Sequence, residues 1–161
     1  MNAKYSNTQL EELVHKLAWN DAFGCHTRAG FEKMIWPEIA PRARWLVYFD
    51  INGMHALNES FGDYAQVDAM IKQVLGVVRK TDYVCGQFKS GDEFVIAITE
   101  NDQRAVLDPK GLVDRLTEEL KKVGMSAMFA TVQVKSMDLV ENVQPAVDQV
   151  YAAKKARGIS R

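Results

Sequence analysis

Two adjacent carboxylates, Asp92 and Glu93, stand directly before an apolar run in the segment KSGDEFVIAI. The five residues FVIAI are too apolar to face water and are typical of a buried strand. The Ser90-Gly91 pair before the two acids is typical of a tight turn. The sequence therefore predicts two carboxylates at the mouth of a buried strand.

A third acid, Asp50, ends another apolar run, WLVYFDI (45–51), which also predicts a buried strand. If the two strands are neighbours, Asp50 and Asp92 converge at one edge of a sheet. Paired acids on rigid strand ends suit a hard divalent cation such as Mg²⁺, which takes one or two carboxylates together with phosphate oxygens. Such a metal site bridges nucleotide phosphates and activates a hydroxyl for in-line displacement. The alternative is a pair of solvated acids, which are common at strand ends and turns.

Length and composition describe an ordinary globular protein of one domain, 1–161, with 47% apolar and 25% charged residues. The net charge of −1 indicates neither a nucleic-acid nor a membrane surface. Two cysteines make no disulfide framework and fit a reducing compartment. The chain has no apolar run of about 20 residues and no signal peptide at its polar start, so we expect a cytoplasmic protein or the soluble part of a longer one.

Periodicity predicts an α/β, or α+β, sandwich in which helices pack on a mixed or antiparallel sheet. An N-terminal helix over 6–19 begins with a capping box made by Ser6 and Gln9. A loop over 21–31 and a short helix before Pro37 follow. The remaining predicted elements are a strand at 45–51, helices at 53–60 and 64–80, a hairpin of strands 83–89 and 93–99, a helix at 109–122, a strand at 125–135, and a helix at 138–157 that is interrupted near Pro145.

SGDEF (90–94), with Asp50 upstream, resembles the signature of the GGDEF family, the diguanylate cyclases. That family has a palm-like fold shared with adenylate cyclases and polymerases. The resemblance implies a central, mostly antiparallel sheet flanked by helices. Four further segments resemble the family's motifs in the same order: DAFGCHTRAGF (21–31), FDINGMHALNESFG (49–62), RKTD (79–82) and VYAAKKARG (150–158).

The resemblance implies a reaction between two subunits. Each subunit binds one GTP, and each 3′-hydroxyl attacks the α-phosphate of the partner's GTP, giving cyclic di-GMP and two pyrophosphates. Catalysis therefore requires at least a transient homodimer. Beyond one short helix, residues 1–20 offer no strong coiled coil, so we expect a monomer or a weak dimer.

The resemblance also implies roles for individual residues. Asp50, Asp92 and the backbone carbonyl of Ile51 hold Mg²⁺ or Mn²⁺, and Glu93 serves as a further metal ligand or as a base. The other candidate site residues bind nucleotide or product: the Ser90-Gly91 turn the phosphates, Asn58 the purine edge, Lys154 and Arg157 the terminal phosphates, and Arg79 with Asp82 cyclic di-GMP as an inhibitor.

Several positions depart from the family's pattern. Ser90 replaces the first glycine of the signature, and Asn52 replaces the second acid of D-x-D. The segment after Gly62, whose acid reads guanine in the family, is shortened, so that Asp63 or Asp68 takes its place or neither does. Guanine presents an N1–H and an amino group, so its reader has to be an acceptor.

Two further departures affect the phosphate and inhibitory sites. Seven residues separate Asp82 from Ser90, where the family has five, which predicts weak or absent product inhibition. The closing Gly-Arg is reversed, as Arg157-Gly158. Three interpretations remain open: an active cyclase, a regulatory module that binds GTP or a cyclic dinucleotide without turnover, and an interaction domain that keeps the fold alone.

Overall fold

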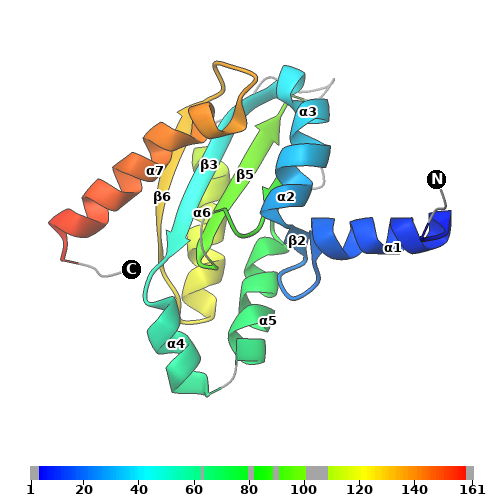
Figure 1. The fold of residues 1–161 in the computed structure, drawn as a ribbon. Helices are drawn as coiled ribbons and strands as arrows, with labels where there is room; N and C mark the ends of the chain where they lie inside the picture. The colour runs from blue at the N-terminus through cyan, green and yellow to red at the C-terminus, as the bar shows by residue number, and fades with distance from the viewer. Residues whose placement is uncertain (1–3, 63, 80–81, 89–90, 101–108, 159–161) are drawn as a thin grey trace.

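The computed structural model describes residues 4–62, 64–79, 82–88, 91–100 and 109–158. These residues form one six-stranded sheet of order β1-β2-β4-β5-β3-β6, with helices on both faces (Figure 1). The strands are β1 (Trp19–Asn20), β2 (Cys25–His26), β3 (Ala43–Ile51), β4 (Tyr83–Cys85), β5 (Glu93–Thr99) and β6 (Ala127–Gln133).

β3 lies inside the sheet and pairs antiparallel with β5 on one side and with β6 on the other. β4 pairs antiparallel with β5, as expected for the predicted hairpin. β1 and β2 are also antiparallel, and among the described strand pairs only the bridge between His26 of β2 and Cys85 of β4 is parallel. The predicted mostly antiparallel sheet and the predicted neighbourhood of β3, β4 and β5 are confirmed.

Each face of the sheet has its own core, because successive side chains of a strand point to opposite faces. Leu46 and Tyr48 of β3 pack under α7 (Leu139–Ala156) and the helical segment 28–42. Val47 and Phe49 pack under α5 (Tyr64–Leu75) and α6 (Lys110–Lys122). Since both faces are covered, β3 and β5 are apolar along nearly their whole length.

The helical segment 28–42 continues past Pro37, although the sequence predicted a short helix before it. It comprises α2 (Arg28–Gly30), a π-helical turn (Phe31–Ile35), α3 (Trp36–Ile39) and a 3₁₀ turn (Ala40–Arg42). In the π-helical turn the N–H of Trp36 donates to the carbonyl of Phe31. The extra residue of this wider turn accommodates Pro37, whose ring crowds the preceding turn and which has no N–H to donate.

α7 is continuous through Pro145, so the predicted interruption of this helix is wrong. Pro145 is exposed, whereas Val143, Val147 and Val150 are buried against the sheet. Proline removes one helical hydrogen bond on the solvent side, and the buried apolar stripe holds the helix together across it. Among the described helices, α7 included, none has the length and apolar character that crossing a bilayer requires.

Three predicted elements are shorter by several residues in the structure. β6 spans Ala127–Gln133 rather than 125–135. α5 ends at Leu75 rather than at residue 80, and β4 ends at Cys85 rather than at residue 89. After β4 the chain leaves the regular ladder: the N–H of Gly86 donates to His26 at 2.6 Å, and the N–H of Phe88 donates to Glu93 at 2.9 Å. The Phe88 bond therefore closes the hairpin outside the regular ladder, and the Gly86 bond ties it to β2. α4 (Met54–Phe61) lies between β3 and α5.

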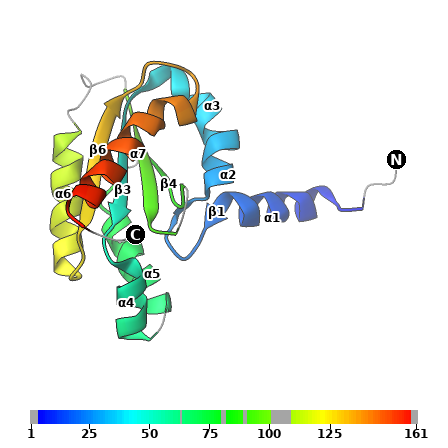
Figure 2. The same ribbon diagram turned by 60° about the vertical axis from the view of Figure 1, so that its left-hand side comes forward.

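α1 (Asn7–Ala18) projects from the body of the molecule (Figures 1 and 2), and its capping box of Ser6 and Gln9 is confirmed. The apolar residues at helical spacing, Leu10 to Leu17, face solvent. The last turn of α1 is held closely, because a Cβ placed at Gly30 would lie 2.3 Å from the carbonyl oxygen of Ala18.

We predict that Gly30→Ala loosens this junction, because backbone atoms of Ala18 occupy the space of the new methyl group. Such overpacking costs about 1–3 kcal/mol. Hydrogen exchange of residues 17–31 should become faster. Gly111→Ala is the matched control: its Cβ meets only Arg115, at 3.8 Å, and alanine favours the helix, so stability should stay level or rise. Unchanged exchange in Gly30→Ala would contradict the tight contact.

Candidate functional site

The candidate site lies where β3 ends and β5 begins, at the lower end of the sheet in Figure 1. Asp50 and Glu93 are cross-strand partners there. The N–H of Ile51 donates to the carbonyl of Asp92 at 2.9 Å, which joins the end of β3 to the hairpin turn. Gly53 then takes a left-handed conformation, φ 63°, which turns the chain into α4. The structure thus brings Asp50 next to the Asp92-Glu93 pair, as predicted.

Asp50 is a fully buried carboxylate with an unusual environment. Burial raises the pKa of Asp50 to about 6, the nearby Asp92 carboxylate adds to the rise, and Lys154 opposes it. The ammonium of Lys154, itself buried, lies 3.1 Å from Oδ1 of Asp50 as an ion pair. The other oxygen of Asp50, Oδ2, is buried and has no hydrogen-bond partner within the described part of the chain.

Glu93 is also fully buried, but its surroundings differ from those of Asp50. The phenol groups of Tyr48, on β3, and Tyr151, on α7, both donate to its Oε1, the second at 2.6 Å. Burial and the Glu93 carboxylate raise the pKa of Tyr48 far above its usual range, so this phenol stays protonated and can donate. Glu93 is therefore held within the core face that α7 covers.

A pocket of about 500 Å³ opens beside Asp92. Residues from the hairpin turn, Gly91 and Asp92, form one side, and residues from α4 and α5 form another, among them Asn58, Tyr64 and Asp68. Oδ1 of Asn58 is buried and has no hydrogen-bond partner among the described residues. The structure therefore gathers three of the predicted site residues, Gly91, Asp92 and Asn58, around one cavity.

A second groove, of about 510 Å³, lies at the opposite end of the sheet, between the start of β3, the end of β6 and the first turns of α7. Its buried polar residue, Asn142, accepts from Lys135 and Ser136 and donates to two backbone carbonyls. Because these bonds satisfy Asn142, we place the candidate site at the pocket beside Asp92.

The donor set at Asp50 and Asp92 fits a divalent cation that keeps most of its water. Among the described residues, Oδ2 of Asp50 is buried without a hydrogen-bond partner, and Asp92 is close enough to raise the pKa of Asp50. In the described ranges, no cluster of three or more His, Cys, Asp or Glu forms a complete metal cage. Mg²⁺ is usually held in this way, by one or two carboxylates with water and substrate phosphates supplying its other ligands.

The other predicted site residues lie in different surroundings. Ser90 and Asp63 lie outside the described residues. Arg157 ends α7 and is exposed. Asn52, in place of the second acid of D-x-D, donates through its side chain to Ser126 at 3.0 Å, which ties the turn after β3 to the start of β6.

Arg79 and Asp82, the predicted inhibitory pair, contact each other. Nε of Arg79 lies 3.6 Å from Oδ2 of Asp82, whose carboxylate is almost completely buried. Burial raises the pKa of Asp82, while Arg79 and Arg115 of α6 oppose the shift. In this conformation the two residues anchor the loop after α5, and a role in product binding stays a prediction.

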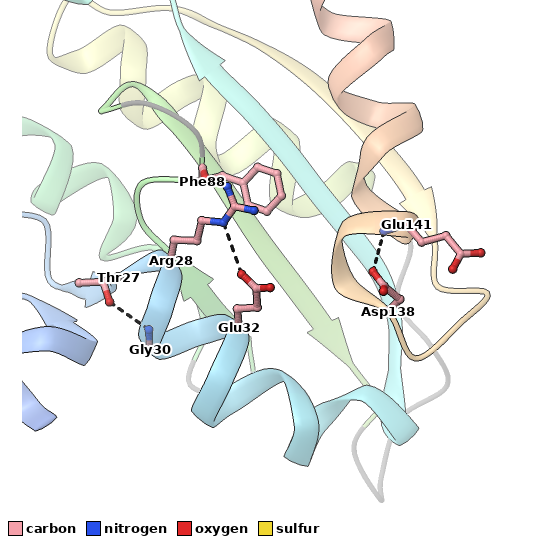
Figure 3. A network of polar contacts seen from close by, with 7 residues as sticks. All are labelled: Thr27, Arg28, Gly30, Glu32, Phe88, Asp138 and Glu141. Carbon is pink, nitrogen blue, oxygen red and sulfur yellow. Dashed lines mark hydrogen bonds and ion pairs between the residues drawn. The ribbon is translucent and has the colours of Figure 1, made fainter.

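Arg28 supports the hairpin from the side of α2, a role that its place in the N-terminal motif did not reveal (Figure 3). Its Nη1 donates to the carbonyl of Phe88 at 2.8 Å, and its guanidinium lies 4.7 Å from the centre of the Phe88 ring. Glu32 pairs with Nε at 3.4 Å, and Thr27 caps α2. Asp138 similarly caps α7 by accepting from the N–H of Glu141. The two caps fix the starts of α2 and α7, and the contact of Arg28 with Phe88 fixes the hairpin.

Sequence reasoning also missed the tyrosines that contact Glu93. Tyr48 precedes Asp50 by two residues, and Tyr151 precedes Lys154 by three. These spacings put each tyrosine on the same face of its element as the neighbouring site residue. The spacing in the sequence indicates that each tyrosine lies near a site residue, but it does not reveal that both tyrosines contact Glu93.

Comparison with solved structures identifies the fold, whereas no model of a protein family and no curated protein sequence matches the chain. A microbial GGDEF domain, studied with cyclic di-GMP, superposes with a TM-score of 0.69 at 15% identity, over 87% of this chain and 94% of that one. A sensory box/GGDEF family protein from Caulobacter crescentus CB15 gives 0.66 at 19% identity, over 86% and 99%.

The diguanylate cyclase SiaD from Pseudomonas aeruginosa, solved with its activator SiaC, gives a TM-score of 0.66 at 14% identity. The match covers 94% of this chain and 64% of SiaD. The chain thus has the fold of GGDEF domains, and the fold that the motifs implied is confirmed.

We predict that metal-free protein becomes less stable as the pH rises from about 4 to above 6. The folded state retains the Asp50 proton up to about pH 6, whereas the unfolded chain releases it near the ordinary aspartate pKa of 3.8. The stabilisation from this group is present below about pH 4 and lost above pH 6, and it amounts to at most about 3 kcal/mol.

Urea unfolding with chelator at several pH values measures this slope. Asp82 contributes a slope of the same sign, so the difference between wild type and Asp50→Asn isolates the contribution of Asp50. An identical slope in both proteins would show that Asp50 titrates normally in the folded state.

Proposed function

We propose that this chain binds a nucleoside triphosphate with a divalent cation in the pocket beside Asp92 and, as a transient homodimer, condenses two GTP into cyclic di-GMP. The observation that carries the proposal is the environment of Asp50. Both of its oxygens are buried beside Asp92: Oδ1 faces the ammonium of Lys154, and Oδ2 has no hydrogen-bond partner in the described part of the chain. An arrangement of two acids and one buried cation suits metal and phosphate together.

Asp50 and Asp92, with the carbonyl of Ile51, hold Mg²⁺ or Mn²⁺ in this proposal. The bound metal neutralises phosphate charge and favours attack at phosphorus. Lys154, paired with Asp50 in the free protein, turns to the terminal phosphates of the nucleotide. Its position beside the acids keeps a positive charge at the place where negative charge arrives.

The base lies between α4 and α5 in this proposal. Asn58 and Asp68 both line the pocket, and the side-chain oxygen of Asn58 is buried without a hydrogen-bond partner in the described residues. Guanine offers an N1–H and an amino group, for which an amide oxygen and a carboxylate are suitable acceptors. We therefore assign the guanine-reading role to Asp68.

One pocket of this size holds one nucleotide, so cyclisation requires two subunits facing each other. The 3′-hydroxyl of each nucleotide attacks the α-phosphate of the other, and pyrophosphate leaves. The neighbouring carboxylate of Asp92 accepts the hydroxyl proton. Turnover then depends on how often two loaded subunits meet.

A binding module without turnover is the second candidate function. It is favoured by the orientation of Glu93, whose Oε1 accepts from the buried Tyr48 and the half-buried Tyr151. If Glu93 takes no part in proton transfer, Asp92 has to do so alone. In a binding module the nucleotide is held by the same contacts, and the nucleotide-bound form of the protein acts as the signal.

We predict that incubation with Mn²⁺ or Mg²⁺ and each of the four NTPs yields cyclic di-GMP from GTP, identified by mass spectrometry. The specific rate should rise with protein concentration, because the reacting species is a dimer. Asp92→Asn should abolish the product, and Asp114→Asn, on the exposed side of α6, should not. Binding of GTP without product at high protein concentration would favour the binding module.

We predict that Asp68→Asn reduces the preference for GTP over ATP, because an amide replaces a charged acceptor. A hydrogen bond to a charged group contributes about 1.5–3 kcal/mol, which corresponds to roughly a tenfold or larger loss of preference. Competition titrations with both nucleotides measure it. Equal preference in wild type and variant would remove Asp68 from the base site.

A further inference from the structure

The buried carboxylate of Glu93 joins three elements of the fold. It belongs to β5, and its Oε1 accepts from Tyr48 of β3 and from Tyr151 of α7. A carboxylate buried without such donors costs several kcal/mol. The two phenols therefore compensate this burial, and α7 is tied to the sheet by a polar contact as well as by apolar packing.

The contact with Tyr151 lies one helical turn from Lys154. Residues three apart share a face of a helix, so Tyr151 and Lys154 both point to the sheet. Tyr151 meets Glu93, and Lys154 meets Asp50 at 3.1 Å. Because Asp50 and Glu93 are themselves cross-strand partners, these two contacts set α7 in register with the ends of β3 and β5.

The rotation of α7 about its own axis is sensitive to this arrangement. The apolar stripe of Val143, Val147 and Val150 holds the helix on the sheet, but apolar contacts are non-directional. A hydrogen bond from a phenol to a fixed carboxylate is directional. It selects the rotation at which the ammonium of Lys154 reaches Asp50.

We propose that Glu93 is a positioning residue: by accepting a hydrogen bond from the Tyr151 phenol, it holds α7 so that Lys154 is delivered to the metal and phosphate site beside Asp50. This inference rests on the proposed function. It differs from the expectation, drawn from the family resemblance, that Glu93 is a metal ligand or a base. The direct ligands are then Asp50 and Asp92.

A double-mutant cycle between Tyr151 and Lys154 tests the proposal. Tyr151→Phe should weaken binding of Mg²⁺–GTP about tenfold, within the range of couplings between contacting residues, and should leave guanosine binding unchanged. In a Lys154→Ala background, Tyr151→Phe should have no further effect. Additive losses, or an equal loss for guanosine, would overturn the proposal.

Two matched controls separate positioning from general destabilisation. Tyr48→Phe removes a donor to the same oxygen but lies on β3, so it should lower stability without the selective loss of triphosphate binding. Glu93→Gln keeps an oxygen that can accept from both phenols and should retain Mg²⁺–GTP binding, whereas Glu93→Ala should not. If Glu93→Gln abolishes Mn²⁺ binding measured with the metal alone, Glu93 is a ligand and the proposal fails.

The proposed function and this inference can fail separately. If wild type binds no triphosphate, the proposed function is wrong, and a crystal structure of Tyr151→Phe then tests the positioning by itself. The Lys154–Asp50 distance should exceed about 4 Å, the limit of an ion pair. An unchanged contact would overturn the inference.

Discussion

Asp50 and Glu93 are neighbours across β3 and β5, and neither carboxylate reaches water. Each has a different compensation, since Asp50 faces the ammonium of Lys154 and Glu93 accepts from two phenols. α7 supplies a partner to both acids. These two contacts fix the angle at which the helix crosses the sheet and its position along the strands. The capped start of α7, its unbroken course through Pro145 and its buried stripe all serve this placement.

The central strands could be predicted from the sequence, because β3 and β5 are buried on both faces and therefore read as continuous apolar runs. The shortest elements could not. β1 and β2 have two residues each, too few for any period, and they form through pairing partners far along the chain. The passage through Pro37 depends on a π-helical turn, which is a response to local crowding that no hydrophobic pattern encodes.

The part of the candidate site that could be predicted from the sequence consists of acidic residues at strand ends. Asp50 and Asp92 mark the ends of apolar runs, so their convergence followed from the pairing of two strands. Tyr151 and Glu93 are separated by 58 positions, and their contact depends on how α7 packs. The resemblance to a family of nucleotide cyclases implied that Glu93 is a metal ligand or a base. The structure shows that its carboxylate accepts hydrogen bonds from two phenols.

The tight contact between Gly30 and Ala18 has a mechanical consequence. α1 has 12 residues, which makes it a lever about 18 Å long, and a tilt of about 10° at its base displaces its far end by about 3 Å. With no room at Gly30 to absorb such a tilt, force applied to α1 passes into α2. Arg28 of α2 donates a hydrogen bond to the Phe88 carbonyl, so a displacement of α1 is transmitted through α2 to the hairpin that carries Asp92.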